Sequence, residues 1–306
     1  MISRKIITNL AQEVGFDLVG VVRAEALDDE YNRFKEWLLD GNCSTLSYLE
    51  RNIEKRFDAS RLVEGSRSVV VCAVSYLSPY SRAYSDDCRT KIASYALNRD
   101  YHITIKSMLE QLASALKCYE PELRYRSFVD SAPLAEKSYA HRAGLGWIGR
   151  QSLLVNPKLG SMMHLGELVI DAEVDEYDTP MEGVGCGSCR RCVEACPNGA
   201  ILDNRTIDTR RCISCRTIER EAEGDTQPLH GWIFGCDICQ SVCPFNQHAP
   251  LHCNPQFDPI VTPEMLSAER FESMTEEEFN TIVAQTPMLR AGFERIRKNA
   301  LKNNEK

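Results

Sequence analysis

Two runs of cysteine constrain this chain more than any other feature of its sequence. The first run has the spacing C-x2-C-x2-C-x3-C before a proline and consists of Cys186, Cys189, Cys192 and Cys196. The second run, which also precedes a proline, is one cysteine shorter; it is Cys236, Cys239 and Cys243, and Cys212 lies between the runs. In such a spacing three cysteines hold one [4Fe–4S] cluster and the fourth binds a second cluster. The sequence therefore predicts two clusters and a protein that moves single electrons.

Two other uses of these cysteines explain the pattern less well. Disulfides need an oxidising compartment, and polar residues between Thr8 and Glu13 interrupt the apolar core that a signal peptide would need. A zinc ribbon uses paired C-x2-C knuckles, which leave the three-cysteine spacing and the following proline unexplained. Cys215 stays an alternative to Cys212 as the eighth ligand, because spacing alone does not distinguish them.

Length and composition indicate a globular protein. The 306 residues allow one large core and a smaller module. No apolar stretch approaches the roughly 20 residues of a membrane span, so we expect no membrane contact. We expect a reducing cytoplasm as the location, because thiolates stay available to iron there. The net charge of −8 argues weakly against a nucleic-acid partner. Residues 205–216 and 286–306 are nevertheless locally basic, which suits either a confined anionic contact or a solvated helix face.

The order of elements predicts an α/β or α+β core over the first 180 residues, because helical and strand patterns alternate there. Helices are expected at 3–14, from Asp28 to Gly41 and at 100–118, and strands at 18–22, 68–76, 125–129 and 164–172. After Pro250 the pattern is helical, with capping signals at Thr262 and Thr275. We therefore divide the chain into a core (1–178), a cluster module (179–255) and a helical segment (256–306).

Asp130 and a glycine-rich segment are candidates for chemistry outside the cysteines. Asp130 ends a strand and Pro133 predicts a helix start, so Asp130 either caps that helix or faces a pocket. Residues 142–166 contain five glycines, three of which match G-x-G-x-x-G from Gly144 onward. Because this segment follows a helix rather than a strand, we reject a nicotinamide site. The glycines are expected to line a large flat cofactor or to form tight turns.

His102 begins a helix in the sequence Asp100-Tyr101-His102. A D-x-H-x-x-G motif would indicate a histidine that binds the cobalt of cobalamin, but Ile105 occupies the glycine position. That mode of binding is therefore not supported. His102 is then either a surface histidine at a helix start or a residue with another function.

Several motifs together resemble the epoxyqueuosine reductase family, whose members use iron–sulfur clusters and cobalamin to finish queuosine in tRNA. The resemblance covers nearly the whole chain and is carried by Lys55-Arg56, Tyr95-Ala96, 100–102, 129–134, 142–149, Leu165-Gly166-Glu167, 186–197, 211–214 and 235–244. The chain departs from the family pattern at Arg150-Gln151, where Lys-Asn is usual, and at Cys215, where an aromatic residue is common. The C-terminal helical repeats of longer members are not expected in these 306 residues.

The resemblance implies a nitroreductase-like α/β (α+β) core that binds cobalamin, a ferredoxin-like module with two [4Fe–4S] clusters, and C-terminal helices. One cluster would be held by Cys186, Cys189, Cys192 and Cys243, and the other by Cys196, Cys212, Cys236 and Cys239. Cobalamin would be bound base-off, with no protein histidine on cobalt. Asp130 would be the proton donor, with a pKa raised by burial. Cofactor contacts are expected at Arg56, Asp130, Leu154, Leu165, Ser214 and Asp237.

The implied function is the reduction of epoxyqueuosine to queuosine at the wobble position of tRNA. An external low-potential donor would supply electrons, and the basic stretches with Lys55-Arg56 would contact the anticodon stem-loop; a monomer is expected. One alternative is an enzyme like the cobalamin-dependent reductive dehalogenases, which usually carry an export signal. Another is a ferredoxin-type electron carrier, which would need neither the glycine-rich segment nor Asp130 at a strand end.

Overall fold

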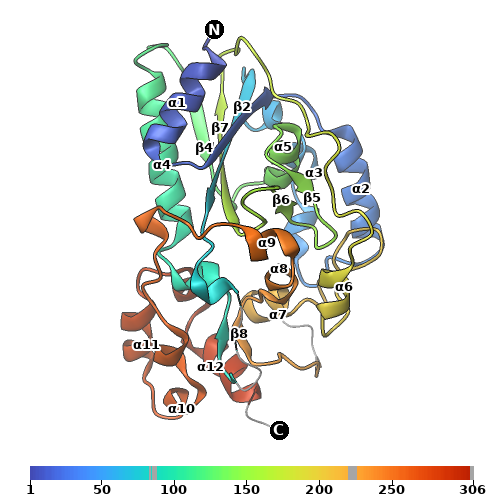
Figure 1. The fold of residues 1–306 in the computed structure, drawn as a ribbon, viewed down its shortest axis with the longest axis vertical. Helices are drawn as coiled ribbons and strands as arrows, with labels where there is room; N and C mark the ends of the chain where they lie inside the picture. Colours follow the sequence, from blue (N-terminus) through green and yellow to red (C-terminus); the bar gives the residue numbers. More distant parts are fainter. Residues whose placement is uncertain (83, 85–87, 220–225, 304–306) are drawn as a thin grey trace.

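A four-stranded antiparallel sheet forms the centre of the N-terminal half of this computed structural model, which describes residues 1–82, 84, 88–219 and 226–303 (Figure 1). The strands lie in the order β1 (Leu18–Arg23), β2 (Ser68–Ser75), β7 (Met163–Ile170) and β4 (Tyr125–Phe128). Every residue of β2 is buried, as its continuous, largely β-branched run predicts. The expected mixed fold is confirmed, and the antiparallel pairing makes it an α+β arrangement.

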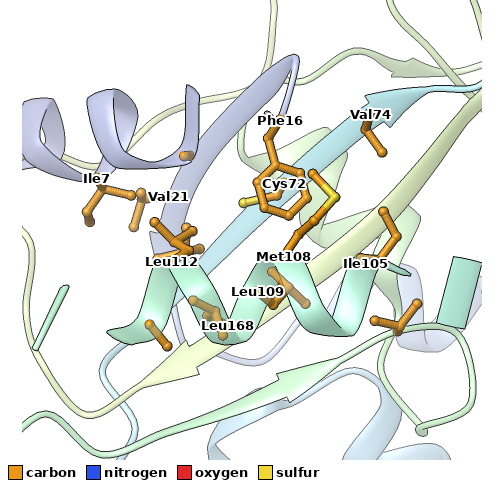
Figure 2. Packing of buried hydrophobic residues seen from close by; sticks show 14 of the residues in the cluster. Ile7, Phe16, Val21, Cys72, Val74, Ile105, Met108, Leu109, Leu112 and Leu168 are labelled. Carbon is orange, nitrogen blue, oxygen red and sulfur yellow. The ribbon is translucent and has the colours of Figure 1, made fainter. Parts of the chain in front are cut away.

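Two helices, α1 (Arg4–Val14) and α4 (Tyr101–Leu116), cover one face of this sheet (Figure 1). Their apolar residues recur at helical spacing, so Ile7 of α1 and Met108 of α4 pack in one core with Cys72 of β2 (Figure 2). Asp100 caps α4, because its side chain accepts a hydrogen bond from the backbone N–H of His102. The packing of α4 thus fixes where its polar first turn lies.

The other face carries α2 (Asp28–Leu39), α3 (Ile53–Arg56), α5 (Glu136–Arg142) and the hairpin of β5 (Trp147–Ile148) with β6 (Leu154–Val155). The predicted start of α5 at Pro133 was too early, because the helix begins at Glu136. The residues between β4 and α5 form a turn instead. Its last residue, Ala135, donates a backbone hydrogen bond to the carbonyl oxygen of Arg56 at 2.8 Å. This bond ties the turn to α3.

A short parallel pairing joins the cluster segment to the rest of the chain. β3 (Lys91–Ile92) pairs with β8 (Trp232–Phe234). The cluster segment also contains four short helices, α6 (Arg191–Ala195), α7 (Ile213–Ile218), α8 (Ile238–Ser241) and α9 (Pro244–His248). In Figure 1 they lie between the central sheet and the C-terminal helices.

The C-terminal helices α10 (Ala268–Phe271), α11 (Glu276–Val283) and α12 (Phe293–Lys302) enclose a separate core. This core contains Ile92 and Leu97 from the N-terminal part, Phe234 from the cluster segment, and Phe279 and Ile296 from the C-terminal helices. The division at 178 and 255 stays a prediction, and this core draws on all three predicted segments.

Short 3₁₀ helices connect the larger elements at Ser47–Glu50, Ala59–Arg61, Pro79–Ser81, Ser94–Leu97, Pro255–Phe257, Pro263–Leu266 and Pro287–Ala291. Thr275 caps α11 through a reciprocal pair of hydrogen bonds with Glu278, as the sequence signal indicated. Asp28 is the first residue of α2 rather than its cap. In the part of the chain that the structure describes, no helix combines the length and apolar character that a membrane crossing requires.

Replacing Gly166 with alanine is expected to destabilise the fold. Gly166 lies on β7 beneath α4, and a Cβ atom there would lie 2.4 Å from the Cγ2 methyl of fully buried Ile105. The strand or the helix must shift, which costs about 1–3 kcal/mol and is measurable as a lower free energy of unfolding in denaturant. In an Ile105→Ala background the same substitution should cost less, because the clashing methyl is absent; equal costs in both backgrounds would contradict this contact.

Candidate functional site

Asp130 occupies the turn between β4 and α5 and is held by the first turn of α4. Its φ of 52° is a left-handed value that residues other than glycine rarely adopt. The Tyr101 hydroxyl donates a hydrogen bond to Asp130 Oδ2 at 2.8 Å, and His102 Nε2 lies 3.2 Å from the same oxygen. Asp130 does not cap α5, whose N-cap residue is Ala135. Its backbone N–H donates to the Glu136 side chain instead.

His102 lies between two carboxylates. Its Nδ1 is 2.7 Å from Asp100 Oδ1, and its Nε2 faces Asp130. Burial alone would lower the pKa of His102, but its hydrogen bonds to both carboxylates outweigh burial and raise the pKa to about 9. The alternative of a surface histidine was wrong for His102, because its side chain is only 18% exposed and is protonated at neutral pH.

The pKa of Asp130 is lowered, so the expectation that burial would raise it was wrong. Burial does act in the expected direction, but the hydrogen bonds from His102 and Tyr101 stabilise the carboxylate more strongly. The side chain is also 52% exposed, so its desolvation is incomplete. In this arrangement the proton rests on His102, beside an ionised Asp130.

A cavity of about 630 Å³ lies against Asp130, within the size range of ligand pockets. The aromatic rings of Tyr95, Tyr101 and Phe234 contribute to its wall. Its charged lining residues are Arg51, Arg56, His102, Asp130, Glu219, Arg290 and Arg295. The lining comes from α3, the start of α4, β8, the end of α7 and the segment before α12, so the cavity lies where distant parts of the chain meet. Its basic groups outnumber its two carboxylates, those of Asp130 and Glu219, which suits an anionic ligand that requires a proton.

Arg56 is the predicted cofactor contact that best fits a bound polar group. Its Nε atom is buried and has no hydrogen-bond partner among the described residues, so a ligand's polar edge could accept from it. Leu154 on β6 and Leu165 on β7 do not line the cavity as described. Leu154 belongs to the apolar core on the α5 side of the sheet, and Leu165 packs against that core.

Asp237 and Ser214 are also absent from the described lining of the cavity. Asp237 is buried and accepts a hydrogen bond from the backbone N–H of Ser94 at 2.7 Å. Burial raises the pKa of Asp237 to about 6. Ser214 is half-buried in α7, one turn before the cavity-lining end of that helix. In this structure Asp237 thus links the cluster segment to the start of a 3₁₀ helix of the core.

The cysteines predicted as ligands gather into two neighbouring groups. In the first, burial raises the pKa of Cys192 and the nearby thiols of Cys186 and Cys243 raise it further. Cys243 is in turn influenced, after burial, by Cys186 and Cys189. These are the four residues of the first predicted ligand set. The spacing of the cysteines within each run does not reveal that Cys243 lies close to the first run.

The second group contains the remaining predicted ligands. Burial raises the pKa of Cys236, with Cys212 and Cys196 adding to the shift, and Cys239 is likewise raised by burial and then by Cys236 and Cys212. Cys215 lies beside Cys212, and burial raises its pKa to about 12. No three His, Cys, Asp or Glu side chains in the described residues could hold a single metal ion. In a four-iron cluster each cysteine binds a different iron, so the sulfurs stand farther apart.

The glycine-rich segment brings hydrogen-bonding side chains to the first cysteine group. The Trp147 indole N–H donates to Cys186 Sγ at 3.5 Å. Gln151 is buried with its Oε1 3.9 Å from Cys192 Sγ, and its Nε2 has no partner among the described residues. Rotation of the amide would point this N–H at the sulfur. Donors of this kind fit cysteines that act as thiolate ligands.

The glycines of this segment allow chain segments to approach one another closely. A Cβ on Gly146 would lie 2.2 Å from the carbonyl oxygen of Val155, and one on Gly160 would meet the side chain of Asn246. Gly160 also has a φ of 71°. These positions therefore need glycine for contacts within the chain, which supports tight turns over a cofactor-lining role.

The first basic stretch is largely engaged within the chain. Arg216 is 2% exposed and donates to the carbonyl oxygen of Gln227 at 2.6 Å. Arg210 and Arg211 form ion pairs with Asp208 at 2.8 and 3.3 Å. The expectation that residues 205–216 present a basic surface was therefore wrong for Arg216, which stabilises a loop. Arg210 and Arg211 are partly neutralised by their ion pairs with Asp208, so they contribute less positive charge to that surface.

The second basic stretch reaches the cavity. Arg290 and Arg295 both line it, and Arg295 also donates to the carbonyl oxygen of Ile218 at 3.1 Å. Lys306 lies outside the described residues. The sequence indicated the charge of this stretch but not its position. Tertiary packing alone brings this stretch to the cavity that Asp130 lines, just as it brings His102 next to Asp130.

Two family profiles match this chain. The family described as "Epoxyqueuosine reductase QueG, DUF1730" matches residues 56–131, a range that runs from Arg56 past Asp130. The "4Fe-4S double cluster binding domain" matches residues 185–246, which contain all eight cysteines predicted as ligands. The chain thus contains a double [4Fe–4S] domain.

Curated relatives and solved structures carry the same description. The chain is 39% identical to the epoxyqueuosine reductase of Cyclobacterium marinum, over 96% of this chain and 94% of the relative. It is 35% identical to that of Leadbetterella byssophila, over 96% of each. A crystal structure of an epoxyqueuosine reductase with an epoxyqueuosine-modified tRNA-Tyr stem loop matches with a TM-score of 0.88 and 27% identity, covering 98% of this chain and 80% of that one. The Streptococcus thermophilus structure matches with a TM-score of 0.83 and 28% identity, over 97% and 79%.

Replacing His102 with glutamine should change how stability depends on pH. The folded-state pKa of about 9 lies above the ordinary 6.5, so the stability from protonated His102 is fully present below 6.5 and is lost as pH rises through about 9. The difference in Tm between wild type and His102→Gln should therefore shrink across that interval, measured anaerobically by circular dichroism. The exposed His248, replaced in the same way, is the control; a pH-independent difference for His102→Gln would contradict the pairing.

Proposed function

The chain belongs to the epoxyqueuosine reductase family, and we propose that it reduces epoxyqueuosine to queuosine at the wobble position of tRNA. The observation that carries this proposal is the cavity in which Asp130 and protonated His102 meet the arginines of the C-terminal segment. Opening the epoxide and losing water consumes two electrons and two protons. The cluster domain accounts for the electrons, and the cavity accounts for the proton donor and an anionic substrate.

The eight cysteines would hold the two clusters in a crossed arrangement. Cys186, Cys189, Cys192 and Cys243 would bind one, and Cys196, Cys212, Cys236 and Cys239 the other. The two groups of mutually influencing thiols support this assignment. An external low-potential donor would reduce the clusters. Because these thiolates need a reducing compartment, we place the protein in the cytoplasm. We further propose that it is a monomer.

Cobalamin, bound base-off, would occupy the cavity region, with Arg56 donating to its polar edge and the aromatic residues facing its ring. Leu154, Leu165, Ser214 and Asp237 stay predicted contacts. When bound, cobalamin supplies the reducing chemistry at the substrate carbon. The chain's own contribution is to position both molecules, to exclude water and to deliver protons.

Asp130 would deliver the proton to the opening epoxide oxygen. At rest this proton lies on His102 Nε2, 3.2 Å from Asp130 Oδ2. Transfer through Asp130 leaves His102 neutral between two carboxylates. His102 then readily takes up a proton from solvent, because its pKa is raised to about 9. Proton delivery to the substrate then depends on the pKa of the His102–Asp130 pair more than on the lowered pKa of Asp130 alone.

The substrate would enter from the side of the arginines. Arg51, Arg290 and Arg295 line the cavity and would pair with phosphates of the anticodon stem-loop. Since the modified base lies in a stacked loop, it must leave the stack to reach the cavity. The stem-loop bound to a family member of the same fold supports this partner.

Asp130→Asn should keep both clusters and bound cobalamin but lower turnover by about 10²- to 10⁴-fold, the usual contribution of a positioned acid. Mass analysis of the modified nucleoside after incubation of epoxyqueuosine-containing tRNA with reduced protein measures turnover. Iron content and corrinoid absorbance are the controls. Full activity in this variant would remove Asp130 from the mechanism.

Cys196→Ala should damage the cluster assigned to Cys196, Cys212, Cys236 and Cys239 and leave the other in place. Iron per chain should fall by about half after anaerobic reconstitution, since each cluster holds four irons, and low-temperature EPR of the reduced protein should show one cluster signal. The exposed Cys118, replaced by alanine, is the control. Two intact clusters would contradict the crossed assignment, unless a further Cys215→Ala substitution then removes one, which would identify Cys215 as the replacement ligand.

A further inference from the structure

A buried carboxyl group lies in the central sheet close to the catalytic turn. Glu167 of β7 is fully buried, opposite Val71 of β2 and Phe128 of β4. Because side chains alternate along a strand, it points to the same face as Leu165 and Val169, the apolar face that α5 covers. A carboxyl group there needs a partner, since an isolated buried carboxylate is strongly unfavourable.

The partner of Glu167 is Glu136, the first residue of α5. The two carboxyl groups are within hydrogen-bonding reach of each other. No N–H or O–H donor of the described residues reaches either oxygen of Glu167. Burial, together with the other carboxylates, raises the pKa of both groups. Like charges in contact disfavour a second ionisation, so this arrangement favours one proton held by the pair.

The surroundings indicate which member of the pair carries the charge. The titratable groups that face Glu136 are Asp130, Tyr101, Arg56 and Lys137, and those that face Glu167 are Asp130, Cys72 and Tyr139. Both cations, Arg56 and Lys137, act on Glu136. The negative charge therefore belongs on Glu136 and the proton on Glu167.

Glu136 also holds the turn that carries Asp130. Its Oε1 accepts the hydrogen bond from the Asp130 backbone N–H. Asp130 has a left-handed φ of 52°, a conformation that costs about 1 kcal/mol or more and persists only when neighbouring groups hold it. The bond to Glu136 fixes the backbone at this residue, whereas Tyr101 and His102 hold its side chain.

We propose that Glu136 and Glu167 share one proton and that this pair is a latch for the catalytic turn, with Glu136 as a positioning residue. Protonated Glu167 donates to one oxygen of Glu136, and the other oxygen accepts from the Asp130 N–H. The proposal rests on the function proposed above only in assigning proton donation to Asp130. The shared proton itself does not depend on any activity.

Infrared spectroscopy tests the shared proton without substrate. At neutral pH the wild-type protein should show a carbonyl band of a protonated carboxyl group that is missing in Glu167→Gln. The exposed Glu182, replaced by glutamine, should leave the band in place. If the wild-type and Glu167→Gln spectra are identical in this region, the shared proton is refuted, whatever the enzyme's activity.

Two substitutions of Glu136 test the latch. Glu136→Ala leaves the Asp130 N–H without its acceptor, so kcat should fall about tenfold, the value of one hydrogen bond, while KM for tRNA and iron content stay near wild type. Glu136→Gln should restore most of kcat, because its amide oxygen accepts from Asp130 and its amide nitrogen donates to Glu167.

Wild-type kcat in Glu136→Ala, or equal losses in the alanine and glutamine variants, would overturn the positioning role. Asp130→Asn separates this result from the proposed function. Full activity of Asp130→Asn would refute the proton donor, whereas the infrared band would still decide whether Glu136 and Glu167 share a proton.

Discussion

The contact between the first turn of α4 and the turn after β4 is the interaction on which the candidate site depends. It consists of hydrogen bonds to one carboxylate oxygen of Asp130, and it places a protonated His102 beside an ionised acid. The apolar residues of α4 anchor the helix on the sheet, so apolar packing determines where its polar end lies. The site's protonation state is thus a result of how the sheet and helix pack.

Much of the local structure could be predicted from the sequence. The spacing of the cysteines, the buried run of β2 and the capping residue Thr275 each carry their signal within a few residues. The site could be predicted only in part, because Asp130 meets His102 and Glu136 meets Glu167 through tertiary contacts. The predicted direction of the Asp130 pKa shift was wrong for the same reason. Burial of the carboxyl group was foreseeable, but the two hydrogen-bond donors that outweigh burial were not.

The glycine-rich segment connects the catalytic core with the cysteine loops. Its glycines allow backbone segments to meet at distances that a side chain would prevent, and its Trp147 places an indole N–H against Cys186. A donor on a cluster sulfur favours the reduced, more negative form of that cluster. One segment therefore both packs closely against the core and sets the environment of the first cysteine group.

The third hydrophobic core brings together Ile92, Phe234 and Ile296, residues that leave the ribosome at very different times. N-terminal units generally fold first during synthesis, whereas this core can close only after α12 has emerged. All the cysteines of both groups precede α12 in the sequence. During translation, every predicted ligand cysteine is therefore already part of the chain before this core can close.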